Sequence, residues 1–103
     1  MATFITNATQ DGRQDGVAIT TQFATVTITG LDANPGSNAR VQVQYSEDDV
    51  TYYDTTDVFH RDGAFDIAIL AGTNSNFVAA NIIGLSEKAS PTEIDGTILF
   101  NPA

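Results

Sequence analysis

Along several segments of the chain, apolar and polar side chains alternate with a period of two, and no other feature restricts the fold as strongly. In residues 24–29 three apolar side chains alternate with three threonines, and the same alternation recurs in residues 40–45 and 64–69. Successive side chains of a strand point to opposite faces, whereas the pattern of a helix repeats about every 3.6 residues. These segments are therefore predicted to be strands that bury one face.

Further strands are predicted from shorter or more apolar segments. They are residues 3–6, 17–20, 51–53, 57–59, 77–83 and 98–100. Residues 77–83 are apolar on both faces, which is typical of a central strand covered on both sides. The one helical candidate, residues 85–89, is short and is stopped by Pro91.

Turn-forming residues separate the predicted strands. They lie at residues 11–16, 32–38, 47–49, 62–63 and 71–76. Strands that follow one another about every eight to twelve residues, with turns between them, are typical of sandwiches and small barrels. We therefore predict an all-β fold, an antiparallel β-sandwich that is immunoglobulin-like or a related Greek key, with about seven to nine short strands.

The chain of 103 residues has the size of one domain, so residues 1–103 are predicted to form a single sandwich. Residues 1–10 leave three alternatives open. They form an edge strand of the same sandwich, an N-terminal arm that adds a strand to a neighbouring subunit, or a frayed terminus.

The chain is strongly acidic, with a formal net charge of −9. A field of this sign repels phosphate groups, so neither nucleic acid nor an anionic membrane is an expected partner. No apolar run approaches the roughly 20 residues that cross a bilayer, and the first residues lack a secretory signal pattern. We therefore expect either synthesis and use in the cytoplasm or a processed form of the protein. The acidity suits a protein partner with a basic patch, and solubility alone is the alternative explanation.

Catalysis is not expected, because few groups in the sequence could carry it. His60 is the only histidine, and no Gly-x-Ser-x-Gly motif supplies a nucleophile for it. Acid pairs such as Asp48/Asp49 and Asp54/Asp57 fall in or near turns, where water keeps them ionised. The chain is therefore predicted not to be an enzyme, with His60 exposed or at an interface.

No cofactor or metal is predicted either. The chain has no cysteine and one histidine, which argues against structural zinc. Residues 11–16 have some likeness to a calcium loop, but Arg13 and Gln22 stand where acidic ligands belong. An irregular calcium site that includes Asp48 and Asp49 stays an open alternative.

Residues 41–54 read Val-Gln-Val-Gln-Tyr-Ser-Glu-Asp-Asp-Val-Thr-Tyr-Tyr-Asp and resemble a hairpin of small β-sandwich proteins in tailed bacteriophage virions. There, a strand ending in Gln-Tyr-Ser precedes an Asp-rich turn, then Val/Trp-Thr and an aromatic residue. Residues 62–67, 71–73 and 96–100 are similar to the same group. The loose motif covers about half the chain, leaves residues 1–40 unmatched, and departs from the usual glycine at Asp49.

The resemblance implies a virion structural protein without catalytic residues. Small size, acidity and the lack of cysteine are most similar to capsid decoration, or cement, proteins, which bind the outer capsid surface and stabilise the shell. The implied partners are a capsid or other virion protein and further copies in a trimer or dimer, and the implied location is the virion. The alternatives are a tail, neck or fibre component and a non-catalytic carbohydrate-binding module.

Aromatic and apolar residues are favoured as interface anchors. On this basis the predicted contact residues are Phe4, Ile5, Tyr52, Tyr53, Phe59 and His60.

Overall fold

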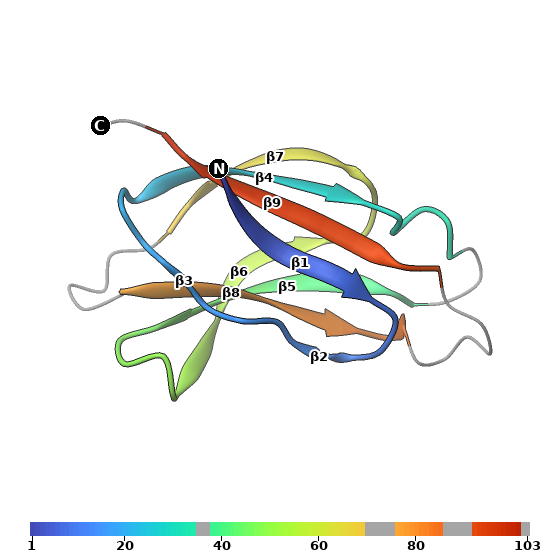
Figure 1. Ribbon diagram of the computed structural model, residues 1–103, viewed down its shortest axis with the longest axis horizontal. Helices are drawn as coiled ribbons and strands as arrows, with labels where there is room; N and C mark the ends of the chain where they lie inside the picture. The colour runs from blue at the N-terminus through green and yellow to red at the C-terminus, as the bar shows by residue number, and fades with distance from the viewer. Residues whose placement is uncertain (35–37, 70–75, 86–91, 102–103) are drawn as a thin grey trace.

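The computed structural model describes residues 1–34, 38–69, 76–85 and 92–101, which form nine strands in two layers (Figure 1). The strands are β1 (Ala2–Ala8), β2 (Gly12–Arg13), β3 (Val17–Ala18), β4 (Phe23–Thr29), β5 (Arg40–Ser46), β6 (Tyr52–Phe59), β7 (Gly63–Ala68), β8 (Phe77–Ile83) and β9 (Ile94–Phe100). Sheet A has the order β1-β9-β4-β7, and sheet B has the order β2-β8-β5-β6, with β3 also paired to β8.

The predicted all-β sandwich is confirmed, since both sheets are antiparallel and their strands are short. The helical candidate at residues 85–89 and the loop at residues 71–76 lie almost entirely outside the described residues.

The chain follows the path of one long hairpin that is rolled up into two sheets. At the tip of this hairpin β5 pairs with β6, and then β4 pairs with β7, β2 and β3 with β8, and β1 with β9. The last strand, β9, lies between β1 and β4. In an immunoglobulin domain it would lie beside the strand before it. The observed order is the double Greek key of a jelly roll, so the related Greek key is the variant present.

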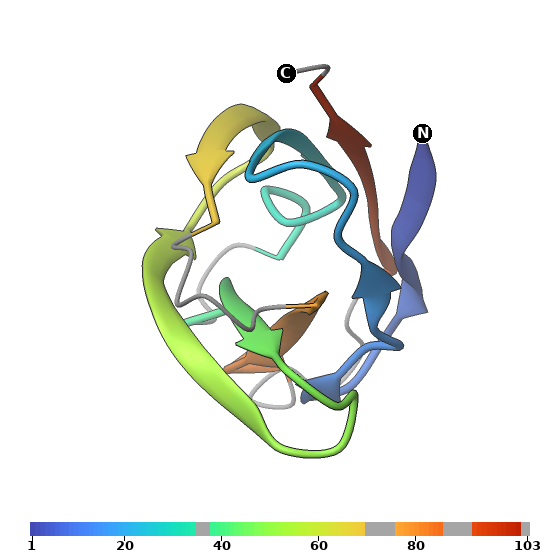
Figure 2. The ribbon, with the colours of Figure 1, turned by 90° about the vertical axis from the view of Figure 1, so that its left-hand side faces the viewer.

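The view along the longest axis shows the two sheets facing each other (Figure 2), and the buried apolar side chains form one core between them. On β4, Ala24, Val26 and Ile28 are fully buried, and the threonines between them point outward, as the alternation predicts. β8 is an inner strand of sheet B, which agrees with its apolar pattern. Apolar burial in this layer provides the main driving force for folding.

β1 is an edge strand of its own sandwich and not a free arm. It pairs with β9, and a bulge between Thr3 and Ile5 places one extra residue opposite Gly96 and Thr97. The bulge allows the consecutive side chains of Phe4 and Ile5 to point into the core, where each is 1% exposed. Both are predicted from the sequence as contact residues. The structure makes them core residues instead, because their apolar surface is already buried within the chain.

β6 unites residues 51–53 and 57–59, which the sequence predicts as separate strands, and it does so through an irregular register against β5. The side-chain amide of Gln42 on β5 donates to the carbonyl oxygens of Thr55 (2.9 Å) and Asp57 (3.2 Å). Because buried carbonyl groups require donors, the amide stabilises this irregular stretch. Gln42 is therefore buried, although the alternation predicts that it lies on the solvent side.

A carboxylate connects two loops at one end of the sandwich. Asp62, between β6 and β7, accepts hydrogen bonds from the N–H groups of Gly30 (3.2 Å), Leu31 (2.7 Å) and Asp32 (3.1 Å). Gly30 has a φ of +87°, and a Cβ atom there would clash with the carbonyl group of Glu93. This turn therefore requires glycine.

Candidate functional site

The four other predicted contact residues lie on or beside the β5–β6 hairpin and differ in exposure. They are Tyr52, Tyr53, Phe59 and His60. Tyr53 is 53% exposed, and its ring lies 5.6 Å from that of Tyr45. His60 is exposed. Phe59 is half-buried and stacks on Phe65 with ring centroids 4.3 Å apart, next to the core. Phe59 is therefore mainly a packing residue, and Tyr53 and His60 remain accessible to a partner.

The side chain of Tyr52 makes its main contacts within the molecule. The guanidinium of Arg13 lies 4.2 Å from the centroid of its ring, and its hydroxyl group donates a hydrogen bond to the carboxylate of Asp49. Burial, followed by the hydrogen bond and the charge of Asp49, raises the pKa of Tyr52 well above its usual value. The hydroxyl group therefore holds the ring to the hairpin tip, and the contact between the ring and Arg13 joins the hairpin to the segment that holds Arg13.

The hairpin tip, residues 47–51, is held in one conformation by Asp48. Its carboxylate accepts hydrogen bonds from the N–H groups of Val50 and Thr51 and from the hydroxyl group of Ser46, at 3.0, 3.0 and 3.1 Å. These bonds lower the pKa of Asp48, with those from Thr51 and Val50 the largest causes. Asp49 has a φ of +62°, in the left-handed region that asparagine and aspartate tolerate better than most residues. The tip is therefore an ordered, acidic projection.

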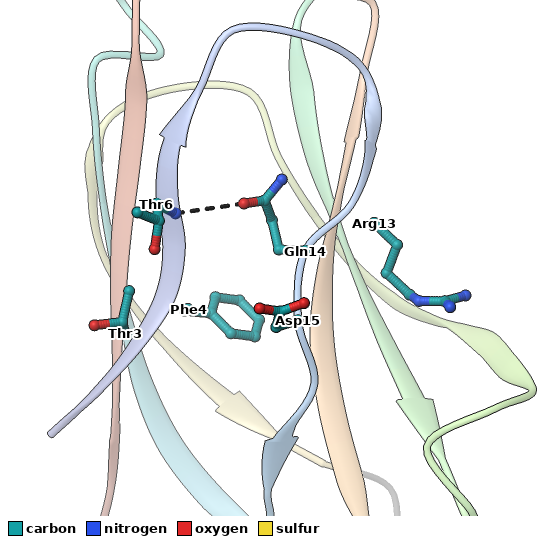
Figure 3. A pocket seen from close by; sticks show the side chains of 6 residues that line it. All are labelled: Thr3, Phe4, Thr6, Arg13, Gln14 and Asp15. Carbon is teal, nitrogen blue, oxygen red and sulfur yellow. Dashed lines mark hydrogen bonds between the residues drawn. The ribbon is translucent and has the colours of Figure 1, made fainter.

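A polar groove of about 370 Å³ lies between β1 and the segment after β2 (Figure 3). It is lined by Thr3, Phe4, Thr6, Arg13, Gln14 and Asp15. The amide oxygen of Gln14 accepts a hydrogen bond from the N–H group of Thr6 (3.3 Å), while Arg13 points away from the groove. The groove brings together hydroxyl groups and a carboxylate, but His60 lies at a different hollow. It therefore does not assemble a nucleophile with an imidazole base.

His60 borders a second hollow, of about 280 Å³, together with Asn38, Ala39 and Arg40. The pairing of Val41 with Phe59 places Arg40 and His60 next to each other at the same end of β5 and β6. The guanidinium of Arg40 donates to the carbonyl oxygen of Asn38 at 3.0 Å. This contact orients the arginine at the rim of the hollow.

The outer face of sheet A exposes large apolar side chains. Phe23 on β4 is 62% exposed, and Leu99 on β9 is 47% exposed. Leu99 pairs with Thr25, two residues from Phe23, so Phe23 and Leu99 are diagonal neighbours on the same face. We call this surface the sheet A face. Its residues are Thr3, Phe23, Thr25, Thr27, Thr29, Ala64, Asp66, Ala68, Asp95, Thr97 and Leu99.

Neither Phe23 nor Leu99 is among the contact residues predicted from the sequence, although a signal for both is present. The alternation of residues 24–29 extends back by one residue, which places Phe23 on the same side as the threonines. In the same way, Leu99 lies between two inward-facing residues of β9. An apolar residue in the polar phase of an alternating strand is the feature that identifies such a surface.

Within the described residues, no group of three histidine, cysteine or acidic side chains is arranged to hold a metal ion. At the hairpin tip, the carboxylates of Asp48 and Asp49 are engaged by hydrogen bonds within the turn. The described part of the chain also contains no helix that is long and apolar enough to span a membrane.

No known family model matches the chain, and neither a curated protein nor a solved structure shows significant similarity to it.

Proposed function

We propose that the protein is a non-catalytic virion structural protein that binds the outer surface of an assembled capsid through the sheet A face. In this role it is a decoration, or cement, protein. The proposal rests on the resemblance of residues 41–100 to sandwich proteins of phage virions. The observation that carries it is the exposure of Phe23 and Leu99 side by side on a regular sheet.

The composition of the sheet A face supports adhesion to another protein. Exposed apolar side chains that lie together mark interaction sites, and aromatic residues are favoured anchors. Threonines lie around the two residues. Of the acids on this face, Asp66 accepts a hydrogen bond from the hydroxyl group of Thr25 at 2.8 Å, and Asp95 accepts one from the N–H group of Asn7 at 2.9 Å. The hydroxyl groups of the threonines lose less hydration free energy on binding than charged side chains do. The part of the face around Phe23 and Leu99 therefore suits close contact with another protein.

Stabilisation of a capsid would arise from the sum of many weak contacts. One copy of a chain this small buries a modest area, but copies that bridge adjacent capsomers act together. The expected result is a shell that resists expansion and heat better when it is decorated. Removal of one contact residue should then be amplified across the particle.

The proposal is tested by introducing charge into the sheet A face. We expect Phe23→Asp and Leu99→Asp each to weaken the affinity for capsids of the encoding phage, measured by co-sedimentation, by roughly a hundredfold. Each substitution would place an unpaired carboxylate in the buried contact. Val50→Asp is the matched control, because Val50 is 73% exposed but lies at the hairpin tip. Equal binding by all three variants, with folded circular dichroism spectra, would refute the proposed contact.

Copy number distinguishes a decoration protein from the alternatives. Quantitative mass spectrometry of purified virions should find hundreds of copies for a decoration protein, but few for a tail, neck or fibre component. A glycan array tests the carbohydrate-binding alternative, in which the exposed ring of Tyr53 would stack on a sugar. Glycan binding that Tyr53→Ala abolishes would replace the virion proposal.

A further inference from the structure

β7 is the end strand of sheet A, and among the described strands it pairs with β4 alone (Figure 1). This pairing continues from Gly63 to Ala68 without a register shift. An end strand presents backbone N–H and C=O groups to which a further strand can add, unless a bulge, a covering segment or a short length prevents it. β7 is therefore a regular edge with room for another strand.

The other edges of the two sheets are protected within the described part of the chain. β1 contains register shifts, and the N–H group of Thr6 already donates to the side chain of Gln14 at 3.3 Å. β6 has an irregular register against β5, and β2 and β3 contain two residues each. Bulges and short strands are two of the means by which proteins prevent pairing between edges. β7 has neither.

The hydrogen bonds to β4 determine which backbone groups of β7 face the open edge. The N–H group of Ile69 donates to the carbonyl oxygen of Gln22 at 2.7 Å, and this pair continues the register of the two strands. Bonded and non-bonded pairs alternate along an antiparallel pair of strands. Every second residue before Ile69 is therefore also bonded to β4. The residues between them, Ala64, Asp66 and Ala68, direct their N–H and C=O groups away from the sheet.

The side chains of these three residues leave the edge accessible. Ala64 and Ala68 are exposed and small. The carboxylate of Asp66 accepts a hydrogen bond from the hydroxyl group of Thr25 on β4 at 2.8 Å, so it is turned toward the neighbouring strand and not across the edge. An added strand therefore meets backbone groups without a bulky side chain in front of them.

We propose that β7 of one copy pairs antiparallel with β7 of a second copy, with Phe65 at the two-fold axis. Outward backbone groups must meet outward groups, so the registers with the greatest overlap centre on Phe65, Asp66 or Ile67. A centre at Asp66 would place two carboxylates directly opposite each other, which is destabilising. A centre at Ile67 would gain little burial, because that side chain is already only 3% exposed. The register centred on Phe65 avoids both costs.

The aromatic side chains favour a second copy as the added strand. Phe65 is half-buried and stacks on Phe59, with ring centroids 4.3 Å apart. In the proposed register two such stacks meet at the axis, at a non-bonded pair, where opposing side chains lie closest. Aromatic pairs are favourable at these positions. A second copy therefore supplies the ring that covers the exposed part of Phe65.

The dimer joins the two four-stranded sheets into one continuous sheet, and the sheet A faces of both copies then lie on the same side of it. A contact along one short strand is smaller than the roughly 1,200 Å² at which stable interfaces begin, so we expect a weak dimer that forms as the protein is concentrated. The inference goes beyond the proposed function and does not depend on it, since it concerns contacts between copies in solution.

The first test is sedimentation velocity of the full chain across a concentration series. We expect the wild-type protein to dimerise and Ala64→Pro to weaken the dimer by at least roughly tenfold, because proline removes an N–H group that makes no bond to β4. Ala64→Val is the matched control, because it keeps this N–H group, and it should still dimerise. Dimerisation of Ala64→Pro with the wild-type affinity would overturn the proposal.

Charged substitutions test the register. Position 64 of one copy lies opposite position 66 of the other, so Ala64→Lys should strengthen the dimer and Ala64→Asp should weaken it, each by roughly threefold. Thr3→Lys and Thr3→Asp are the matched controls, because they make the same changes of charge at an exposed site on the other edge strand of sheet A. Equal effects at both positions would refute the pairing. A larger gain from Ala68→Lys would refute the register, since it would centre the pair on Ile67.

Amide hydrogen exchange measured by NMR locates the contact. The N–H groups of Ala64 and Asp66 should become protected as the wild-type protein is concentrated, whereas that of Ile67, which is bonded to β4, should be protected throughout. A monomer at every concentration, or a dimer that leaves the first two amides unprotected, would overturn the proposal. So would protection that appears only when capsids are added to a monomer, because β7 would then accept a strand of another protein.

Discussion

At the scale of single residues, polar side chains complete parts of the backbone that the strands leave unpaired. Gln42 forms hydrogen bonds with the irregular stretch of β6. Asp48 does the same at the hairpin tip, and Asp62 at the turn after β4. Each has a specific set of partners, so a change of its charge or of a bonding atom weakens a defined set of hydrogen bonds.

The N–H groups of Thr51 and Val50 lower the pKa of Asp48 from 3.8. A lowered pKa in the folded state means that the carboxylate stabilises the fold above the unfolded pKa and loses this effect as the pH falls through the folded pKa. We expect Asp48→Asn to lower the melting temperature at pH 7, with a difference from wild type that shrinks below pH 3.8. Glu47→Gln serves as the control for loss of a neighbouring charge. A difference independent of pH would contradict this account.

Gly30 has a left-handed φ and lies against the carbonyl group of Glu93. We expect Gly30→Ala to reduce the free energy of unfolding by about 2–4 kcal/mol, because strain and a backbone clash add together. Gly12→Ala is the comparison, since its φ is +141° but a Cβ atom would meet nothing within 4 Å. Urea denaturation should show the smaller loss for Gly12→Ala, and equal losses would disprove the role of the clash.

At the scale of elements, β1 shows how a bulge changes the role of a strand. Regular alternation would direct Phe4 and Ile5 to opposite faces, but the extra residue turns both inward. An edge strand that contributes two large core side chains is an integral part of the fold. Because the alternation pattern does not reveal this bulge, the sequence alone leaves residues 1–10 with three alternatives.

Truncation of a side chain on β1 tests this interpretation. We expect Phe4→Ala to cost about 3–5 kcal/mol of stability in the isolated chain, because it leaves a cavity in the core. Thr3→Ala, at the exposed neighbouring position, should change stability by less than about 0.5 kcal/mol. If residues 1–10 acted as an arm, Phe4→Ala would leave chemical denaturation unchanged and alter only assembly.

At the scale of the whole molecule, the rolled hairpin combines a local pairing with very distant ones. β5 and β6 are joined by a short turn, whereas Ala2 pairs with Ile98 across nearly the whole chain. The entropic cost of closing a loop rises with its length, so the distant pairs form at a greater cost in conformational entropy.

This topology predicts slow folding that begins at the hairpin. We expect relaxation times of roughly milliseconds to seconds, as in other folds rich in long-range pairs. Val43→Ala on β5 should slow folding, whereas Ile98→Ala on β9 should mainly accelerate unfolding. Stopped-flow measurements in urea give both rates for each variant. Equal slowing of folding by the two substitutions would show that the ends of the chain pair early.

The sequence by itself determined the positions of most strands, the buried faces of β4 and β8, and the acidic turn at residues 47–49, because these follow from local alternation and turn chemistry. It did not indicate β2, which lies within a predicted turn, or the continuity of β6. The tertiary structure alone decided the pairing order, the inward turn of Phe4 and the burial of Gln42. It also decided which apolar side chains stay exposed, as at Phe23, and brought Arg40 beside His60. These features depend on contacts between residues that are far apart in the sequence, and a local pattern carries no information about which distant strand will supply the partner.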